Sequence, residues 1–153
     1  MTRSIDIGSE PRGRTYEALV DYLGNRCSSF SLVWREQLSF EEPARVIADR
    51  LRPFLIREER TNEWPGTRLS GHMATVRHYR STQDSLAVLK RQASLFSWEA
   101  SASPEDLAFY DNAGACVFGS VSHEKDAWFN QDLLNADDIK TGIPGIELGR
   151  SGA

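Results

Sequence analysis

The hydrophobic positions along this chain fall into stretches with two different periods. In the first kind, apolar residues recur every three or four positions, as Tyr16, Leu19 and Leu23 do. This spacing places them on one face of an amphipathic helix. Residue types typical of helix ends flank such stretches: Thr15 is a good N-cap, and Pro53 stops a helix. The pattern predicts three helices, at residues 15–24, 40–51 and 82–93.

In the second kind, apolar and polar residues alternate, which is typical of strands with one buried side. Phe30, Leu32 and Trp34 alternate in this way. The clearest example is a hairpin, in which strands at 107–110 and 115–121 flank the break "DNAG". Further strands are predicted at residues 28–34, 54–60 and 73–79, a turn at 64–67, and a short strand or turn at 126–130.

The order of these elements predicts the fold class. Helices and strands are mixed, and the strands are joined by hairpin turns rather than by repeated crossover units, which favours an α+β fold. We expect a mostly antiparallel sheet with about three amphipathic helices packed mainly on one face. The chain starts with a polar stretch and ends in a Gly-rich, charged one. The predicted organisation is a flexible arm at 1–13, one α+β domain at 14–134, and an extended or disordered tail at 135–153.

The composition is that of an ordinary globular domain. The chain has 153 residues, of which 40% are hydrophobic and 26% charged. No apolar run approaches the ~20 residues that span a bilayer, and the polar start lacks the features of a signal peptide, so we expect a cytoplasmic protein. Cys27 and Cys116 are too few for a disulfide framework and are expected to be buried thiols. No cofactor motif is present.

Charge is distributed unevenly along the chain. Residues 1–98 carry 15 Lys and Arg against 12 Asp and Glu, whereas residues 99–153 carry 3 against 10. This difference suits an acidic surface that meets a basic partner, although a solvated tail would explain part of it. The arginines of segment 45–60 are interleaved with carboxylates and do not form the one-signed patch of a nucleic-acid-binding protein.

The stretch "GSVSHEKDAWF" at 119–129 carries the most chemistry. His123 could act as a base oriented by Asp106, with Glu124 beside it and Cys116 or Ser122 as nucleophile. A metal site is not expected, because no second histidine follows at ligand spacing. His123 could share a metal site with His72 and His78 only if the two hairpins were in contact, which the sequence does not prove. We favour a structural His123 at a strand end, followed by a solvated turn.

The four tryptophans are further candidates. Trp34 lies within an apolar strand and is predicted to be buried. Trp64 and Trp98 lie near the ends of elements, where an indole can cover the core or act as an interface anchor, and Trp128 is expected to fold back on the core after the solvated turn. Of these, Trp64 and Trp128 are the candidate contact residues.

Two segments, "SPEDLAFYDNAGACVFGSVSHEKDAWF" (103–129) and "EWPGT" (63–67), support a resemblance. Their Pro-Glu-Asp-Leu start, aromatic pair and Ser-His-Glu exit resemble a C-terminal hairpin of small, single-domain bacterial proteins of the immunity or accessory type. The resemblance implies a bacterial, cytoplasmic protein that binds a partner protein. It carries over no catalytic residues.

Three hypotheses of function follow. The first is a non-catalytic protein-binding domain, of immunity type, whose acidic surface covers a basic partner such as a toxin. The second is a small hydrolase or transferase that uses His123 with a neighbouring carboxylate, and the third is a subunit of a larger bacterial assembly. No membrane or nucleic-acid partner, metal or cofactor is expected. The binding residues predicted for the first hypothesis are Glu105, Asp106, Asp111, Glu124, Asp126, Trp64 and Trp128.

Overall fold

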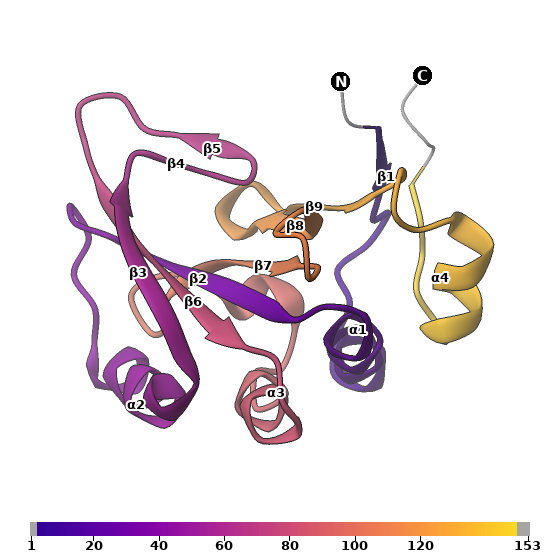
Figure 1. Cartoon of the computed structure of the whole chain (residues 1–153), viewed down its shortest axis with the longest axis horizontal. Coiled ribbons are helices and arrows are strands. Elements are labelled where there is room, and N and C mark those ends of the chain that lie inside the picture. The colour runs from indigo at the N-terminus through magenta and orange to yellow at the C-terminus, as the bar shows by residue number, and fades with distance from the viewer. Residues whose placement is uncertain (1–2, 150–153) are drawn as a thin grey trace.

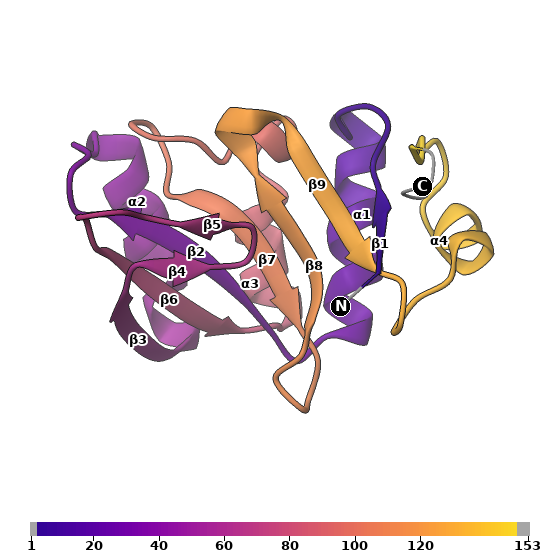
Figure 2. The ribbon, with the colours of Figure 1, turned by 90° about the horizontal axis from the view of Figure 1, so that it is seen from above.

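A seven-stranded antiparallel sheet forms the centre of the fold (Figures 1 and 2). The computed structural model describes residues 3–149. All neighbouring strands of the sheet pair antiparallel. The strands, in their order across the sheet, are β1 (Ser4–Asp6), β9 (Asp126–Asn130), β8 (Cys116–Val121), β7 (Glu105–Tyr110), β2 (Ser29–Arg35), β6 (Ala74–Arg80) and β3 (Leu55–Thr61).

The helices α1, α2 and α3 cover one face of this sheet, as Figure 1 shows. Apolar side chains from the strands and helices meet there in the main core, which contains the fully buried Tyr16, Phe30, Phe109 and Trp98. The predicted α+β class, with its antiparallel sheet and one-sided helices, is confirmed. The helices are α1 (Gly13–Arg26), α2 (Glu42–Leu51), α3 (Gln83–Leu89) and α4 (Ala136–Gly142), and 3-10 turns lie at Arg52–Phe54, Leu95–Ser97 and Ser122–Glu124.

The starts of the helices differ by one or two residues from the predicted ones. α1 begins two residues before Thr15, and the hydroxyl of Thr15 instead donates to the carbonyl of Pro144. α3 is capped by Thr82, whose side chain accepts from the backbone of Ser85 while the Ser85 hydroxyl accepts from Thr82 in return. A capping box therefore starts α3 at Gln83, one residue after the predicted start, and the helix ends at Leu89 and not at residue 93 as predicted.

A small hairpin covers part of the other face of the sheet. It consists of β4 (Glu63–Trp64) and β5 (Thr67–Arg68) and lies over the sheet in Figure 2. Its turn needs Gly66, which has a φ of 82°, and a Cβ at this position would lie 2.5 Å from the Trp128 ring. The indole of Trp64 is buried against Val33 and Val76 in a second, smaller core.

The C-terminal segment is part of the folded body as far as residue 149. Residues 136–142 form α4, and Ile139 and Ile143 are fully buried in the main core. Leu148 then forms a β-bridge with Ile7. The prediction of an extended or disordered tail at 135–153 is therefore wrong for 135–149, and residues 150–153 lie outside the described residues. Two apolar side chains four residues apart suffice to dock one short helix, but they are too few to show a period.

The N-terminal segment is also ordered from residue 3 onward. β1 pairs with β9, and Ile5 is 4% exposed. The backbone N–H of Gly8 donates to the carbonyl of Glu147, so the two ends of the chain support one another. The flexible arm predicted at 1–13 is thus wrong for residues 3–13, because a short edge strand needs only one buried side chain and a pairing partner.

The buried position of Ile143 leads to a prediction about stability. Ile143→Ala should lower the free energy of unfolding by about 2–5 kcal/mol, because it removes buried methylene groups and leaves a cavity. Leu133→Ala is the matched control: Leu133 is 43% exposed, so its replacement should change stability by only about 0.5 kcal/mol. Urea unfolding measures both. Equal effects of the two substitutions would show that the C-terminal segment does not dock on the body.

Candidate functional site

An open pocket of about 620 Å³ lies on the face of the sheet that the large helices leave free. One wall is the β4–β5 hairpin and another is the turn between β7 and β8, while β2, β3 and β6 supply the floor. Concave sites of this size are where ligands and partner side chains usually bind. The pocket is lined by Ser28, Ser29, Ile56, Arg57, Glu59, Glu63, Trp64, Pro65, Gly66, His78, Tyr110, Asp111, Asn112 and Gly114.

His78 is a buried titratable group of this pocket. It is 6% exposed, its Nε2 lies 3.3 Å from Oε1 of Glu59, and its ring packs on the ring of Tyr110 at 5.3 Å between centroids. Burial, and then the charge of Arg57, lower its pKa below the ordinary value, and the carboxylate of Glu59 opposes this shift only in part. His78 is therefore neutral near pH 7.

Tyr110 and Ser31 complete the floor beside His78. The Tyr110 hydroxyl lies 2.9 Å from Oγ of the buried Ser31, so both groups have a hydrogen-bond partner. Burial raises the pKa of Tyr110 to about 12, which keeps the phenol protonated. Because the polar groups of the floor are already paired with one another, the pocket offers a fixed polar surface and not a reactive one.

Carboxylates outnumber cations in the lining of the pocket, although Glu59 lies 3.5 Å from Arg57 and Glu63 3.7 Å from Arg68. Glu59, Glu63 and Asp111 are acidic, whereas Arg57 is the one cation of the lining. Asp111 uses Oδ1 to accept from the backbone of Ala113 and Ala115, so its carboxylate is fixed by the β7–β8 turn. With His78 neutral, the lining carries a net charge of about −2 at pH 7.

A second polar cluster lies where β7 meets the end of β8. The carboxylates of Glu105 and Asp106 and the ring of His123 place one ligand atom each within 4.8 Å of one another, the one such group of three among residues 3–149. Neighbouring residues of a regular strand point to opposite faces. Here the register of β2 against β7 shifts and Asp106 adopts a φ of 57°, which accounts for two adjacent carboxylates on one side.

Both carboxylates of this cluster are already engaged. Arg35 holds Glu105 through two hydrogen bonds, from Nε at 2.7 Å and from Nη2 at 3.1 Å. Asp106 accepts from Nε1 of Trp64 at 2.9 Å and from the backbone N–H of Ser122 at 3.0 Å. A cation bound here would have to compete with the Arg35 guanidinium for Glu105. The donor set therefore favours a structural role over a metal site.

The nucleophiles considered with His123 are not arranged for catalysis. Burial raises the pKa of the Cys116 thiol to about 11, so the thiol is protonated at neutral pH and is a weak nucleophile. The hydroxyl of Ser122 is buried and has no hydrogen-bond partner in the described part of the chain. His123 is 40% exposed, and its Nε2 lies 3.9 Å from Glu124. His123, Glu124 and Asp106 therefore have no activated nucleophile from which they could accept a proton.

Three of the predicted binding residues are buried and therefore do not lie on the surface. Glu105 and Asp106 are buried at 1% and 3% exposure and therefore cannot form the surface contacts predicted for them. Trp64 is also buried, at 6% exposure, so it is a wall of the pocket and not a protruding anchor. Trp128 is half-buried beside Gly66.

The remaining acidic residues occupy two places. Asp111 lines the pocket, whereas Glu124 and Asp126 are exposed at the start of β9. Burial raises the pKa of Asp126, and the charges of Asp6 and Glu124 add to the shift. The sequence reasoning missed the part played by Glu59 and Glu63, because they precede the acidic C-terminal third.

The three histidines lie in different environments. His78 lies in the pocket, His123 in the Glu105–Asp106 cluster, and His72 is exposed in the loop after the hairpin. Sequence reasoning raised His78 only as a member of a shared histidine site. Neighbouring residues of a strand point to opposite faces, and Tyr79 belongs to the apolar set of the strand 73–79. This alternation could have placed His78 on the face of the sheet that the large helices leave free.

No model of a protein family, no curated protein and no solved structure matches this chain. No helix within residues 3–149 is both long and apolar enough to cross a bilayer. The case for a function therefore rests on the geometry of the pocket and its surroundings.

Trp64→Phe should destabilise the fold by about 1–3 kcal/mol, because it leaves one oxygen of the buried Asp106 without its donor. Trp34→Phe is the matched control, since Nε1 of Trp34 makes no hydrogen bond of normal geometry to a described residue. Denaturant unfolding of both variants, of Asp106→Asn, and of Trp64→Phe combined with Asp106→Asn measures the coupling between the indole and the carboxylate. A loss no larger for Trp64→Phe than for Trp34→Phe would contradict the role given to this bond.

The lowered pKa of His78 predicts a change of stability with pH. The folded protein binds a proton at His78 less readily than the unfolded chain, whose histidines titrate near ~6.5. The contribution of His78 to stability is therefore complete above that value and is lost as the pH falls through the lower folded-state pKa. Between pH 7.5 and 5, the free energy of unfolding should fall more for the wild type than for His78→Gln. His72→Gln, in an exposed loop, should behave like the wild type; equal slopes for His78→Gln and wild type would contradict the prediction.

Proposed function

We propose that this protein is a non-catalytic protein-binding domain, of the immunity type, that receives basic side chains of a partner protein in the pocket beside the β4–β5 hairpin. The observation that carries the proposal is the composition of the pocket. Three carboxylates, Glu59, Glu63 and Asp111, line it against a single arginine, and the aromatic side chains of Trp64 and Tyr110 are part of its wall and floor.

This composition suits the side chains of arginine and lysine. A guanidinium or ammonium group gains from carboxylates and also from the face of an aromatic ring, above all where it is partly desolvated. The pocket is open and prearranged, since Asp111 is fixed by its turn and Tyr110 by Ser31. Groups held in place before binding lose little entropy on association.

The exposed carboxylates at the start of β9 support the same proposal. Glu124 and Asp126 are exposed there, and negative charge outside the contact area accelerates the encounter with a basic partner. In this proposal the pocket makes the contact with the partner, and the carboxylates at the start of β9 contribute to the encounter alone. Asp106 serves the pocket indirectly, because it holds Trp64 of the hairpin that forms one wall.

The two other hypotheses have weaker support. A hydrolase or transferase that uses His123 would need an activated nucleophile, and neither Ser122 nor Cys116 provides one. A permanent subunit of an assembly would be expected to expose a continuous apolar surface. The large apolar side chains that are exposed within residues 3–149 are Val46, Leu55, Ile56 and Leu133, which lie on separate elements except for the adjacent pair on β3.

Neutralising the pocket should weaken the capture of a basic partner. The test variant combines Glu59→Gln, Glu63→Gln and Asp111→Asn, which keeps every side chain's shape and the hydrogen bonds of the Asp111 turn. The control variant combines Glu17→Gln, Glu42→Gln and Asp137→Asn, three exposed carboxylates outside the pocket. Quantitative pull-downs from cells of the source organism, with both variants in parallel, identify proteins that the pocket retains.

Association kinetics with the retained protein then complete the test. The pocket variant should associate about tenfold more slowly at low salt, and its rate should depend less on salt than that of the wild type or the control. Equal capture by the pocket variant and the control would contradict the proposed function. Turnover of a substrate by the purified protein, lost in His123→Ala, would favour the enzymatic hypothesis instead.

A further inference from the structure

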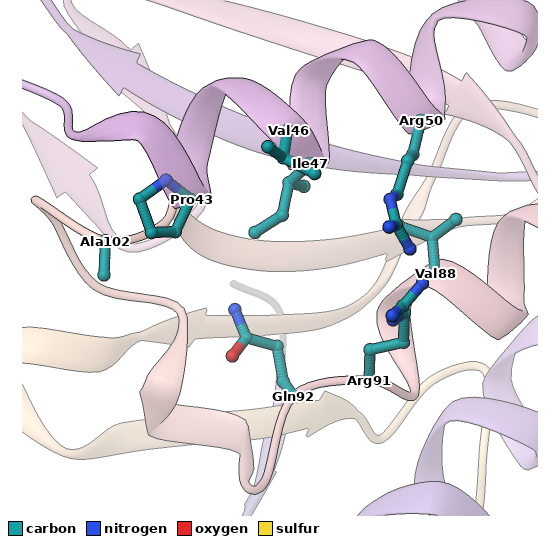
Figure 3. A pocket seen from close by; sticks show the side chains of 8 residues that line it. All are labelled: Pro43, Val46, Ile47, Arg50, Val88, Arg91, Gln92 and Ala102. Atoms are coloured by element: carbon teal, nitrogen blue, oxygen red, sulfur yellow. The ribbon is translucent and has the colours of Figure 1, made fainter.

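An apolar groove runs between α2 and the end of α3, on the helix-covered side of the molecule (Figure 3). Its volume is about 350 Å³. Pro43, Val46 and Ile47 of α2 form one wall, and Val88 of α3 contributes to the other. Val46 is 39% exposed, so this wall presents a large aliphatic side chain to solvent.

Two arginines define one end of the groove. Arg50 extends from α2 and Arg91 from the turn that follows α3, so both side chains approach the same end from opposite walls (Figure 3). Neither guanidinium lies within 4.0 Å of a carboxylate anywhere in residues 3–149, although many other arginines of the chain do form such pairs. Two like charges beside an apolar floor, both without a counter-charge, favour the approach of an anion.

We propose that this groove binds an acidic amphipathic segment of a second protein, with apolar side chains on Val46, Ile47 and Val88 and a carboxylate between Arg50 and Arg91. Grooves between two helices commonly receive an amphipathic helix in this way. A carboxylate can form paired hydrogen bonds with guanidinium groups, which fixes the orientation of the segment. The groove is separate from the acidic pocket and has the opposite charge. It would therefore bind a different partner, or a different part of the same partner.

The observations favour a peptide segment over two other occupants. A second copy of this chain, placed groove to groove, would bring four arginines together, and like charges at an interface oppose association. A membrane surface would be met by protruding apolar side chains, whereas Val46, Ile47 and Val88 line a depression. An apolar floor beside two cations matches a segment that carries both aliphatic and acidic residues.

The test selects peptides from a displayed library of random sequence on the wild-type protein. The same library is counter-selected on a variant that combines Val46→Asp, Arg50→Glu and Arg91→Glu. We expect the enriched peptides to carry aliphatic residues together with Asp or Glu, and to bind the variant at least about tenfold more weakly in fluorescence anisotropy. A second variant, Arg14→Glu with Arg45→Glu, reverses the charge of two exposed arginines outside the groove, as the groove variant does for Arg50 and Arg91, and should bind like the wild type.

Further readouts separate loss of the site from loss of the fold. Circular dichroism and thermal unfolding of each variant should match the wild type, since Val46, Arg50 and Arg91 are exposed. A peptide with Lys in place of its acidic residues should bind the Arg50→Glu, Arg91→Glu protein better than it binds the wild type. Enriched peptides without carboxylates, or equal binding to wild type and groove variant, would overturn the proposal.

The competing occupants are tested in the same experiment. Sedimentation of the protein with vesicles of phosphatidylcholine and phosphatidylglycerol, lost in the groove variant, would assign the groove to a membrane surface and overturn the proposal. Self-association of the wild type, abolished by the same variant in analytical ultracentrifugation, would assign it to a second copy. The acidic pocket is unchanged in all these variants, so failure here leaves the test of the proposed function unaffected.

Discussion

The buried carboxylate of Asp106 is the group on which the second face of the sheet depends. Its two oxygens join the β4–β5 hairpin, through Nε1 of Trp64, to the end of β8, through the backbone of Ser122. Removing a carboxylate from water is costly, and burial accordingly raises the pKa of Asp106. Two hydrogen bonds to the same group offset that cost only if the hairpin stays closed. The position of the pocket wall follows from this requirement.

The two faces of the sheet are stabilised in different ways. The helix-covered face is packed with aliphatic and aromatic side chains, and its few polar atoms are paired, as in the contact between Trp98 and the Tyr16 hydroxyl. The other face holds a small apolar cluster around Trp64 beside buried polar groups such as Ser31 and His78. A packed apolar face gives stability and little else. The polar face keeps charges and hydrogen-bonding groups at fixed positions, and this is why the proposed partner site lies there.

The proposed surfaces carry opposite charges and lie on opposite sides of the molecule. The pocket beside the hairpin is acidic, whereas the groove between α2 and α3 is flanked by Arg50 and Arg91. A domain with this arrangement can hold a basic partner on one side and an acidic segment on the other without competition between them. The rigid sheet separates the two sites, so each can be altered by mutation while the other is kept.

The sequence by itself determined the elements and their class. Alternation placed the strands of the 107–121 hairpin correctly, helical spacing located α1 and α2, and the mixture of both predicted an antiparallel α+β fold. Local signals suffice for these features, because the hydrophobic period of a helix or strand is set by its own geometry. The same signals failed at the chain ends, where β1 and α4 each depend on one or two buried side chains and on partners far away in sequence.

Only the tertiary structure decided which charged residues face water. Glu105 and Asp106 belong to the acidic C-terminal third, yet a bulge in β7 turns both into the interior, toward Arg35 and Trp64. Glu59, Glu63 and Asp111 come from separate segments and meet only because the hairpin folds back over the sheet. Burial and proximity of this kind arise from contacts between residues distant along the chain, and one sequence carries no local signal for them.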